Sequence, residues 1–146
     1  AAWRYGRQAF PVREGLAPGG EMVYRVGVEG SNDVLLGAMR YPPAGTTNLE
    51  ESMGLSKDAW CCPLWCRTIF LAGEGVWDGR TAGPDEFTVP CTLDVTVNAK
   101  EGTLALAVVG GIDMGVVIRG MPTDAPLHLA VGTYEDDCKV TLLARE

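Results

Sequence analysis

One segment constrains the fold of this chain more than any other. CTLDVTVN, residues 91–98, alternates apolar and polar side chains without a break. The odd positions from Cys91 to Val97 are apolar, and the even positions from Thr92 to Asn98 are polar. A period of two is typical of a β-strand with one buried face and one face in water. The segment therefore predicts a half-buried strand in an antiparallel sheet.

Further short segments of this kind run along the chain, with turn residues between them. After AKEG, where Gly102 tolerates the positive φ that a hairpin turn needs, TLALAVVG returns as a second strand. Five more segments predict strands, at residues 22–30, 33–41, 114–120, 127–134 and 138–144. We expect the first two of these five to pair with each other around residues 30–33. Many short strands with frequent turns indicate an all-β sandwich or barrel.

The sequence predicts little helix, because 19 glycines and 9 prolines are spread along its whole length. The single helical candidate is TNLEESMGLSKDAW, residues 47–60, where Asn48 can cap a turn but Gly54 stops a longer helix. A chain of 146 residues buries roughly 68–70% of its unfolded surface as one domain. We expect residues 1–146 to form a single domain, whose start at AAWRYG is compatible with a boundary inside a longer chain.

Charge narrows the range of partners. The chain carries 12 Lys and Arg against 19 Asp and Glu, a net charge of -7, and no stretch concentrates its basic residues. Phosphate backbones and anionic membranes require such a basic patch, so neither nucleic acid nor a membrane is an expected partner. The longest apolar run, residues 104–118, is broken by three glycines and an aspartate, and it is too short to span a bilayer. We expect a soluble chain.

The cysteines are concentrated in KDAWCCPLWCRT, residues 57–68, which also holds two tryptophans. Five cysteines in all, two of them adjacent, do not suit a disulfide framework and favour a reducing, cytoplasmic location. A structural zinc site would need paired ligands such as two C-x-x-C motifs, and CCPLWC has neither that spacing nor a clear second pair. No metal and no cofactor is expected, and apolar packing is the favoured role for the cysteines.

Residues for catalysis are sparse. His128, the single histidine, stands in LHLAV between two leucines, so we assign it a structural role. No nucleophile elbow, Walker loop or H-E-x-x-H motif occurs, and VVGGIDMG is interpreted as a glycine-assisted bend between two strands. The acidic pairs and the run 135–137 are typical of solvated turns. We expect no enzymatic activity.

Several short motifs, taken in order, resemble the SPRY family. MVYRVGVEGSNDVLLGAMRY resembles its paired N-terminal strands, and DAWCCPLW falls where the family often has an aromatic segment. VTVNAKEGTLALAVVGGIDMGVVIRGM resembles its most characteristic block, and LHLAVGTYEDDCKVTLL resembles its closing strands. The resemblance covers about Met22 to Leu143. Differences such as GGID for the family's "NG" and LHLA for its "LYPA" mark a divergent member.

This resemblance implies a bent antiparallel β-sandwich of concanavalin or jelly-roll-like architecture. It also implies a non-catalytic module that binds a protein or peptide through loops at one end of the sandwich. Carried over to this sequence, the surface includes the side chains Arg40, Tyr41, Trp60 and Tyr134. Proximity in sequence adds Trp65, Arg67, Trp77 and Asp78. Trp, Tyr and Arg are also the residue types enriched at interface hot spots, which supports this choice independently.

Two alternatives remain open beside a protein- or peptide-binding module. A lectin-like sandwich would stack exposed aromatic rings on sugars, and an enzyme would depend on His128 or on a carboxylate pair. We expect the 57–68 segment to form an aromatic recognition loop, although Trp60 and Trp65 each fit a buried position in the core equally well. For the protein-binding function we expect a partner segment with basic residues, because the net charge of -7 favours encounter with a positive surface.

Overall fold

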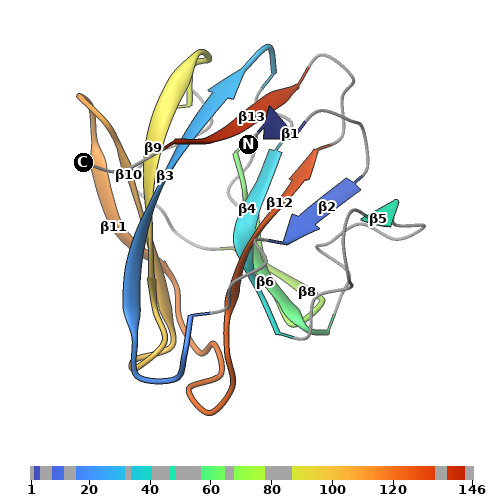
Figure 1. The fold of residues 1–146 in the computed structure, drawn as a ribbon, viewed down its shortest axis with the longest axis vertical. Helices are drawn as coiled ribbons and strands as arrows, with labels where there is room; N and C mark the ends of the chain where they lie inside the picture. The colour runs from blue at the N-terminus through green and yellow to red at the C-terminus, as the bar shows by residue number, and fades with distance from the viewer. Residues whose placement is uncertain are drawn as a thin grey trace.

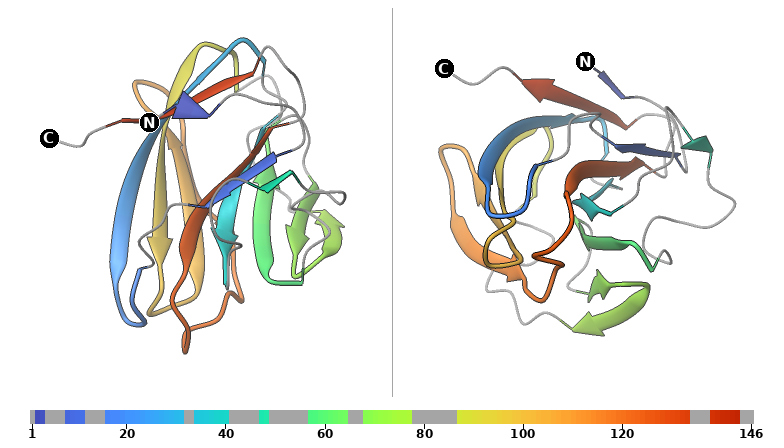
Figure 2. Two further views of the ribbon diagram at one scale, coloured as in Figure 1. Left: turned by 45° about the vertical axis from the view of Figure 1, so that its right-hand side comes forward. Right: turned by 60° about the horizontal axis from the view of Figure 1, so that its bottom comes forward.

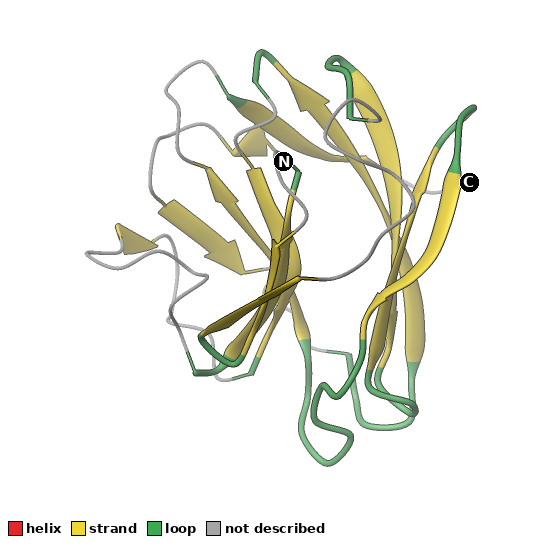
Figure 3. Cartoon of the chain, turned by 180° about the vertical axis from the view of Figure 1, so that it is seen from behind, coloured by secondary structure: helices red, strands yellow, loops and turns green. Residues whose placement is uncertain are grey.

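The chain forms two facing antiparallel β-sheets (Figure 1). The computed structural model describes the backbone of residues 2–3, 8–11, 16–31, 34–40, 47–48, 57–64, 68–77, 87–133 and 138–143. Within these ranges, no helix has the length and apolar character needed to cross a membrane, and Figure 3 shows strands and loops throughout. The expected all-β sandwich is confirmed.

The first sheet has six strands in the order β1-β13-β3-β9-β10-β11. Their bounds are β1 Ala2–Trp3, β3 Glu21–Glu29, β9 Cys91–Asn98, β10 Thr103–Val108, β11 Asp113–Ile118 and β13 Lys139–Leu143. The alternation of residues 91–98 is confirmed, because Leu93, Val95 and Val97 are buried while the polar positions between them are only half-buried. One face of this sheet therefore packs on the core and the other faces water.

The second sheet has seven strands in the order β5-β2-β12-β4-β6-β7-β8. Their bounds are β2 Gln8–Pro11, β4 Val34–Met39, β5 Thr47–Asn48, β6 Ala59–Pro63, β7 Thr68–Leu71, β8 Glu74–Trp77 and β12 His128–Thr133. Every residue of β4 and β6 is buried, on both faces of the sheet. These two strands form the centre of the sheet, and Figure 2 shows how the two sheets face each other in two further views.

The main core lies between the two sheets. It combines the inward side chains of β3, β9, β10 and β13 with those of β4, β6 and β12, together with Phe87 and Met121 from the connections. A smaller cluster lies on the opposite face of the seven-stranded sheet, around Leu35, Met39 and Cys61. Burying apolar side chains of this size contributes about 1.5–3 kcal/mol each, so the two clusters account for most of the stabilising free energy.

The hairpin from β9 to β10 has the expected turn. Gly102 has a φ of +69°, and its N–H donates to the Asn98 carbonyl oxygen at 2.9 Å. The N–H of Met121 donates in turn to the Gly102 carbonyl oxygen at 3.0 Å. A Cβ atom at position 102 would collide with the Met121 carbonyl oxygen, so glycine is needed here both for the backbone angle and for the space. The glycine-assisted bend between β10 and β11 is also confirmed.

Two expectations are corrected. The segments 22–30 and 33–41 contain strands β3 and β4, but these strands lie in opposite sheets and do not pair with each other. β3 pairs with β9 and β13, whereas β4 pairs with β6 and β12. The segment 57–68 is not simply a loop either, because its residues 59–63 form the buried strand β6. The helical candidate 47–60 includes strand β5 and the first residues of β6, and its residues 49–56 lie outside the described ranges.

Candidate functional site: the Arg40 corner

Three side chains meet where β4 ends and β6 begins, and we call this cluster of Arg40, Asp58 and Trp60 the Arg40 corner. Antiparallel pairing of the two strands places Met39 opposite Ala59 and Ala38 opposite Trp60. The backbone N–H of Arg40 donates to the Asp58 carbonyl oxygen at 2.8 Å, which continues the pairing one residue beyond the strands. Arg40 and Asp58 are thereby positioned by the sheet.

The side chains of Arg40 and Asp58 form an ion pair at the surface. The Nη2 and Nε atoms of Arg40 donate to Oδ1 of Asp58 at 3.2 and 3.4 Å. The two side chains keep 32% and 42% of their surface exposed, so the pair contributes at most about 1 kcal/mol to stability. Its value is geometric, because the pair holds a guanidinium group and a carboxylate side by side in contact with solvent.

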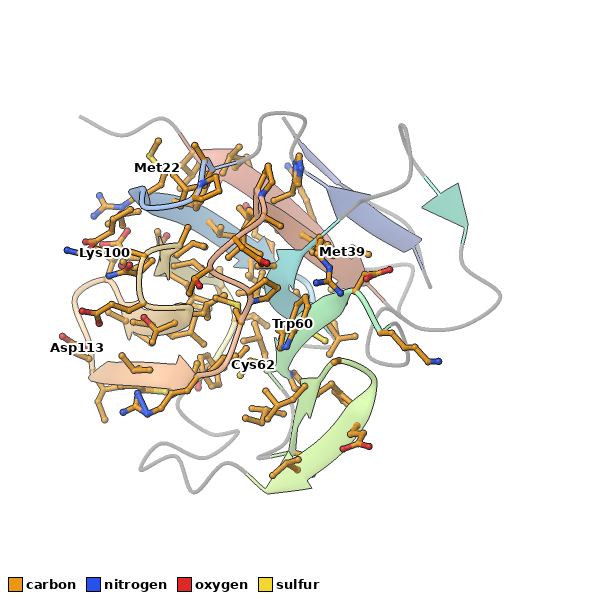
Figure 4. The ribbon with its side chains drawn as sticks, turned by 90° about the horizontal axis from the view of Figure 1, so that it is seen from below. Met22, Met39, Trp60, Cys62, Lys100 and Asp113 are labelled. Atoms are coloured by element: carbon orange, nitrogen blue, oxygen red, sulfur yellow. The ribbon has the colours of Figure 1, made fainter. Side chains whose placement is uncertain are left out.

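Trp60 provides the base on which Arg40 rests. The Cζ atom of Arg40 lies 5.7 Å from the centroid of the Trp60 ring, within the range of a cation–π contact. Only 6% of Trp60 is exposed, and the residue belongs to the core between the sheets. Figure 4 shows Trp60 and Met39 on neighbouring strands at this end of the molecule. The Trp60 ring therefore supports the Arg40 side chain, and little of its own surface is left for contact with a partner.

The turn from β7 to β8 packs beside this corner. Trp60 pairs with Leu71, and the N–H of Ala72 donates to the Ala59 carbonyl oxygen at 3.0 Å. Ala72 has a φ of +53°, an unusual backbone angle for a residue with a side chain, and Gly73 follows it with a φ of +91°. The edge of the corner is thus a tight, strained turn held against β6.

The remaining predicted surface residues are placed only in part. Trp77 lies in β8 opposite Thr68, at the other end of its strand from the Ala72 turn, and its side chain is not described. Five residues of the prediction lie outside the described ranges: Tyr41, Trp65, Arg67, Asp78 and Tyr134. The structure therefore brings Arg40 and Trp60 together, and the partner-binding role of all eight residues stays a prediction.

Asp58 was not singled out from the sequence, although it is the direct partner of Arg40. The two residues are 18 positions apart, and their contact depends on the pairing register of β4 and β6. Local patterns do not encode this register, because both strands are buried on both faces and show no alternation. The only signal was the position of Asp58 immediately before an apolar segment.

The cysteines beside this corner serve packing. Cys61 and Cys62 are thiols fully buried in β6, which confirms the packing role expected for them. Burial, with a smaller contribution from the neighbouring Cys62, raises the pKa of the Cys61 thiol far above its ordinary value. A thiol in this state is protonated and a poor nucleophile. Among the described residues, no group of three or more His, Cys, Asp or Glu side chains is arranged to hold a metal ion.

Comparison with known proteins gives a consistent result for the fold. No protein-family model matches the sequence, and no curated protein matches it either. The SPRY domain of human HERC1 has a similar structure, with a TM-score of 0.69 and 15% sequence identity over 97% of this chain and 85% of that domain. The PSpry domain of TRIM65 gives a TM-score of 0.67 and 12% identity over 96% of this chain and 72% of that chain.

A third similar structure is stonustoxin, with a TM-score of 0.63 and 15% identity. The match covers 92% of this chain but 20% of the toxin chain, so it concerns one part of a larger protein. At such low identities the likeness concerns the fold. It confirms the fold that the resemblance in sequence implied, that of SPRY domains.

Proposed function

We propose that this chain, which has the SPRY fold, is a non-catalytic module that binds a protein or peptide segment at the Arg40 corner. The observation that carries this proposal is the position of the Arg40 guanidinium group, held by Asp58 on one side and by the Trp60 ring beneath it. An arginine whose rotamer is already restrained loses less conformational entropy on binding. Arginine is also among the residues most enriched at interface hot spots.

The chemistry of the corner suits a partner segment with a basic residue. The Asp58 carboxylate keeps 42% of its surface exposed and can accept a hydrogen bond from a partner lysine or arginine. The net charge of -7 would speed the approach of such a segment at low salt. Binding should then weaken as salt is added, and binding that is insensitive to salt would count against a basic partner.

Two further features support a binding role over the alternatives. The Trp60 ring is almost fully covered, which leaves it little surface for stacking on a sugar and disfavours a lectin role at this corner. Burial raises the pKa of the Cys61 thiol beside the corner, so this thiol is held in its unreactive protonated form. The described cysteines Cys61, Cys62, Cys91 and Cys138 are thiols and not disulfides, which fits our proposal of a reducing, cytoplasmic location.

The test is affinity purification from native lysate with the wild-type domain and an Arg40→Met, Asp58→Asn double variant. This variant removes both charges but keeps the apolar stem of residue 40 over Trp60. Glu101→Gln, an exposed single-charge change in the β9–β10 turn, serves as the control. We expect a small set of proteins that wild type and Glu101→Gln retain and that the double variant loses. Retention of the same proteins by all three would place the binding surface elsewhere.

Trp60→Ala is a poor probe for this purpose. Because the side chain is part of the core, its removal would lower stability and abolish binding for reasons unrelated to contact with a partner. Each variant therefore has to show a wild-type near-ultraviolet circular dichroism spectrum and an unfolding midpoint close to that of wild type before its interactions are compared.

A further inference from the structure

A second surface feature lies on the outer face of the six-stranded sheet. It is a hollow of about 830 Å³ at the ends of β3, β9 and β13, lined among others by Gly27, Thr92, Val109, Lys139, Thr141 and Leu143. Alternation along the strands turns Gly27, Thr92 and Thr141 outward, because their neighbours Val26, Val28, Leu93 and Val140 are buried in the core. We call this feature the Gly27 hollow.

The Gly27 hollow is remote from the Arg40 corner along the sandwich. Its lining includes Glu29 at the end of β3, and the chain leads from there into Val34 at the start of β4. Arg40 follows the opposite end of β4. A ligand bound in the hollow would therefore leave the Arg40 corner free, and the two sites can be tested independently.

Gly27 forms the floor of the hollow, although the fold does not require a glycine there. It lies within the nine-residue strand β3, and its φ is not in the left-handed region. A Cβ atom at this position would meet Leu143 Cδ1 at 3.6 Å and the Thr141 carbonyl oxygen at 3.9 Å, which are ordinary contacts. Glycine costs a strand about 0.5–1 kcal/mol relative to alanine. Within strands it often marks a place where a ligand or another backbone approaches closely.

The walls of the hollow are apolar, and the rim formed by Lys139 and Glu29 is charged. Val109 and Leu143 are 41% and 37% exposed, two of the few large apolar side chains on the described surface. Lys139 and Glu29 are directly opposed on β13 and β3, yet they form no ion pair with each other. A cation and a carboxylate thus stand next to the hollow, both able to bind complementary charges of a ligand.

The charged side chains next to the hollow on β3 and β9, Arg25 and Asp94, already pair with each other. Arg25 donates through Nε and Nη2 to Oδ1 and Oδ2 of Asp94 at 2.9 and 3.1 Å, a bidentate ion pair beside Leu143. The hollow is therefore bounded by a closed ion pair on one side and by the charges of Lys139 and Glu29 on the other. Between them, the hydroxyl groups of Thr92 and Thr141 can both donate and accept hydrogen bonds.

We propose that the Gly27 hollow binds an extended peptide segment of a partner protein. An aliphatic side chain of this segment sits over Gly27 between Val109 and Leu143, and an acidic and a basic residue on its two sides pair with Lys139 and Glu29. The threonine hydroxyl groups match the amide groups of a peptide backbone. None of the described residues that line the hollow is aromatic, so they offer no platform for a sugar ring or a nucleobase.

The test uses nuclear magnetic resonance titration of the labelled domain with blocked peptides. The probes are Ac-Gly-Lys-Leu-Asp-Gly-NH2, its reverse-order counterpart Ac-Gly-Asp-Leu-Lys-Gly-NH2, and versions of both with glycine in place of leucine. We expect at least one leucine peptide to produce saturable shifts at the amides of Gly27, Thr92, Val109 and Thr141. The glycine versions should bind at least tenfold more weakly, because they lack the aliphatic side chain.

Gly27→Val fills the floor of the hollow, and we expect it to weaken peptide binding at least tenfold without loss of stability. Ala105→Val adds similar bulk to the same outer face, opposite Thr96 and outside the hollow lining, and should leave binding unchanged. Lys139→Glu should also weaken binding of the leucine peptides, because it removes the cation that pairs with their aspartate.

Three results would overturn the proposal. The first is that neither leucine peptide gives a saturable shift at these residues at millimolar concentration. The second is equal affinity of wild type and Gly27→Val. The third is a dimer in sedimentation that Gly27→Val abolishes, since this would make a second copy of the chain the occupant. None of these outcomes depends on the Arg40 corner, so the function proposed there is tested separately.

Discussion

Gly37 of β4 lies directly opposite Cys61 of β6, and a Cβ atom added at position 37 would come within 2.6 Å of the Cys61 Cα atom. It would also collide with the carbonyl oxygen of Trp60. Both obstacles are backbone atoms of the central strand, so no rotation of a side chain can relieve the contact. The close approach of β4 and β6 therefore depends on the absence of a side chain at Gly37.

We predict that Gly37→Ala lowers the free energy of unfolding by about 3 kcal/mol, because the two central strands would have to move apart. Urea denaturation followed by tryptophan fluorescence measures the change. Gly27→Ala is the matched control, since its new Cβ atom meets only ordinary contacts, and it should be neutral or stabilising. Equal stability of the two variants would show that β4 and β6 are not in close contact at this point.

Trp60→Ala should lower the free energy of unfolding by about 3–5 kcal/mol, as expected for a large buried aromatic side chain. Trp60→Phe keeps an aromatic ring under Arg40 and should cost clearly less. Thermal unfolding monitored by circular dichroism separates the two variants. A loss within 1 kcal/mol for Trp60→Ala would mean that the ring faces solvent, as a recognition loop would require.

The buried thiols should resist modification and make the fold sensitive to alkaline pH. Burial raises the pKa of both Cys61 and Cys91 above the ordinary value of 9.0, so the folded state keeps these protons after the unfolded state has lost them. The free energy of unfolding should therefore fall as pH rises above about 9, with no contribution from these groups to pH dependence at neutral pH.

Denaturant titrations between neutral and alkaline pH measure this decline, and Cys61→Ala should reduce it. Iodoacetamide labelling of the native protein, followed by mass spectrometry, should leave Cys61 and Cys62 unmodified until denaturant is added. Rapid labelling of either residue in the native protein would contradict the buried position of β6.

Ala72→Gly should stabilise the protein by about 0.5–1 kcal/mol. A residue with a side chain pays about 1–2 kcal/mol in the left-handed region, and glycine avoids most of this at the expense of unfolded-state entropy. Ala72→Val, with a branched side chain at the same φ, should have the opposite effect. Differential scanning calorimetry can rank the three proteins, and a destabilised Ala72→Gly variant would argue against a positive φ at this turn.

The half-buried strands could be predicted from the sequence, and the fully buried ones could not be placed. In β9 one face is wet, so alternation reveals both the strand and its inward side chains. In β4 and β6 both faces are buried, and the run VLLGAM carries no information on which residue meets which partner. For this reason β3 and β4 were expected to pair, although each finds its partners far away in the sequence.

The candidate site, too, could be predicted from the sequence only in part. Arg40 and Trp60 were selected as residue types common in interfaces, and the structure brings them within contact distance. The ion pair of Arg40 with Asp58 depends on strand register, and the degree to which Trp60 is covered depends on packing between the sheets. The Gly27 hollow was missed because a single glycine in a strand has no meaning until the side chains around it are placed.

The position of β3 between β9 and β13 has a consequence for synthesis on the ribosome. Val26 is aligned with Leu93 on one side and with Leu142 on the other, so neither neighbour exists until long after β3 has been made. Sheets built from such distant partners fold slowly, because the chain must close large loops before any pairing stabilises them. For much of translation β3 is therefore an unpaired strand, and a chaperone that shields it would have its greatest effect before residue 143 emerges.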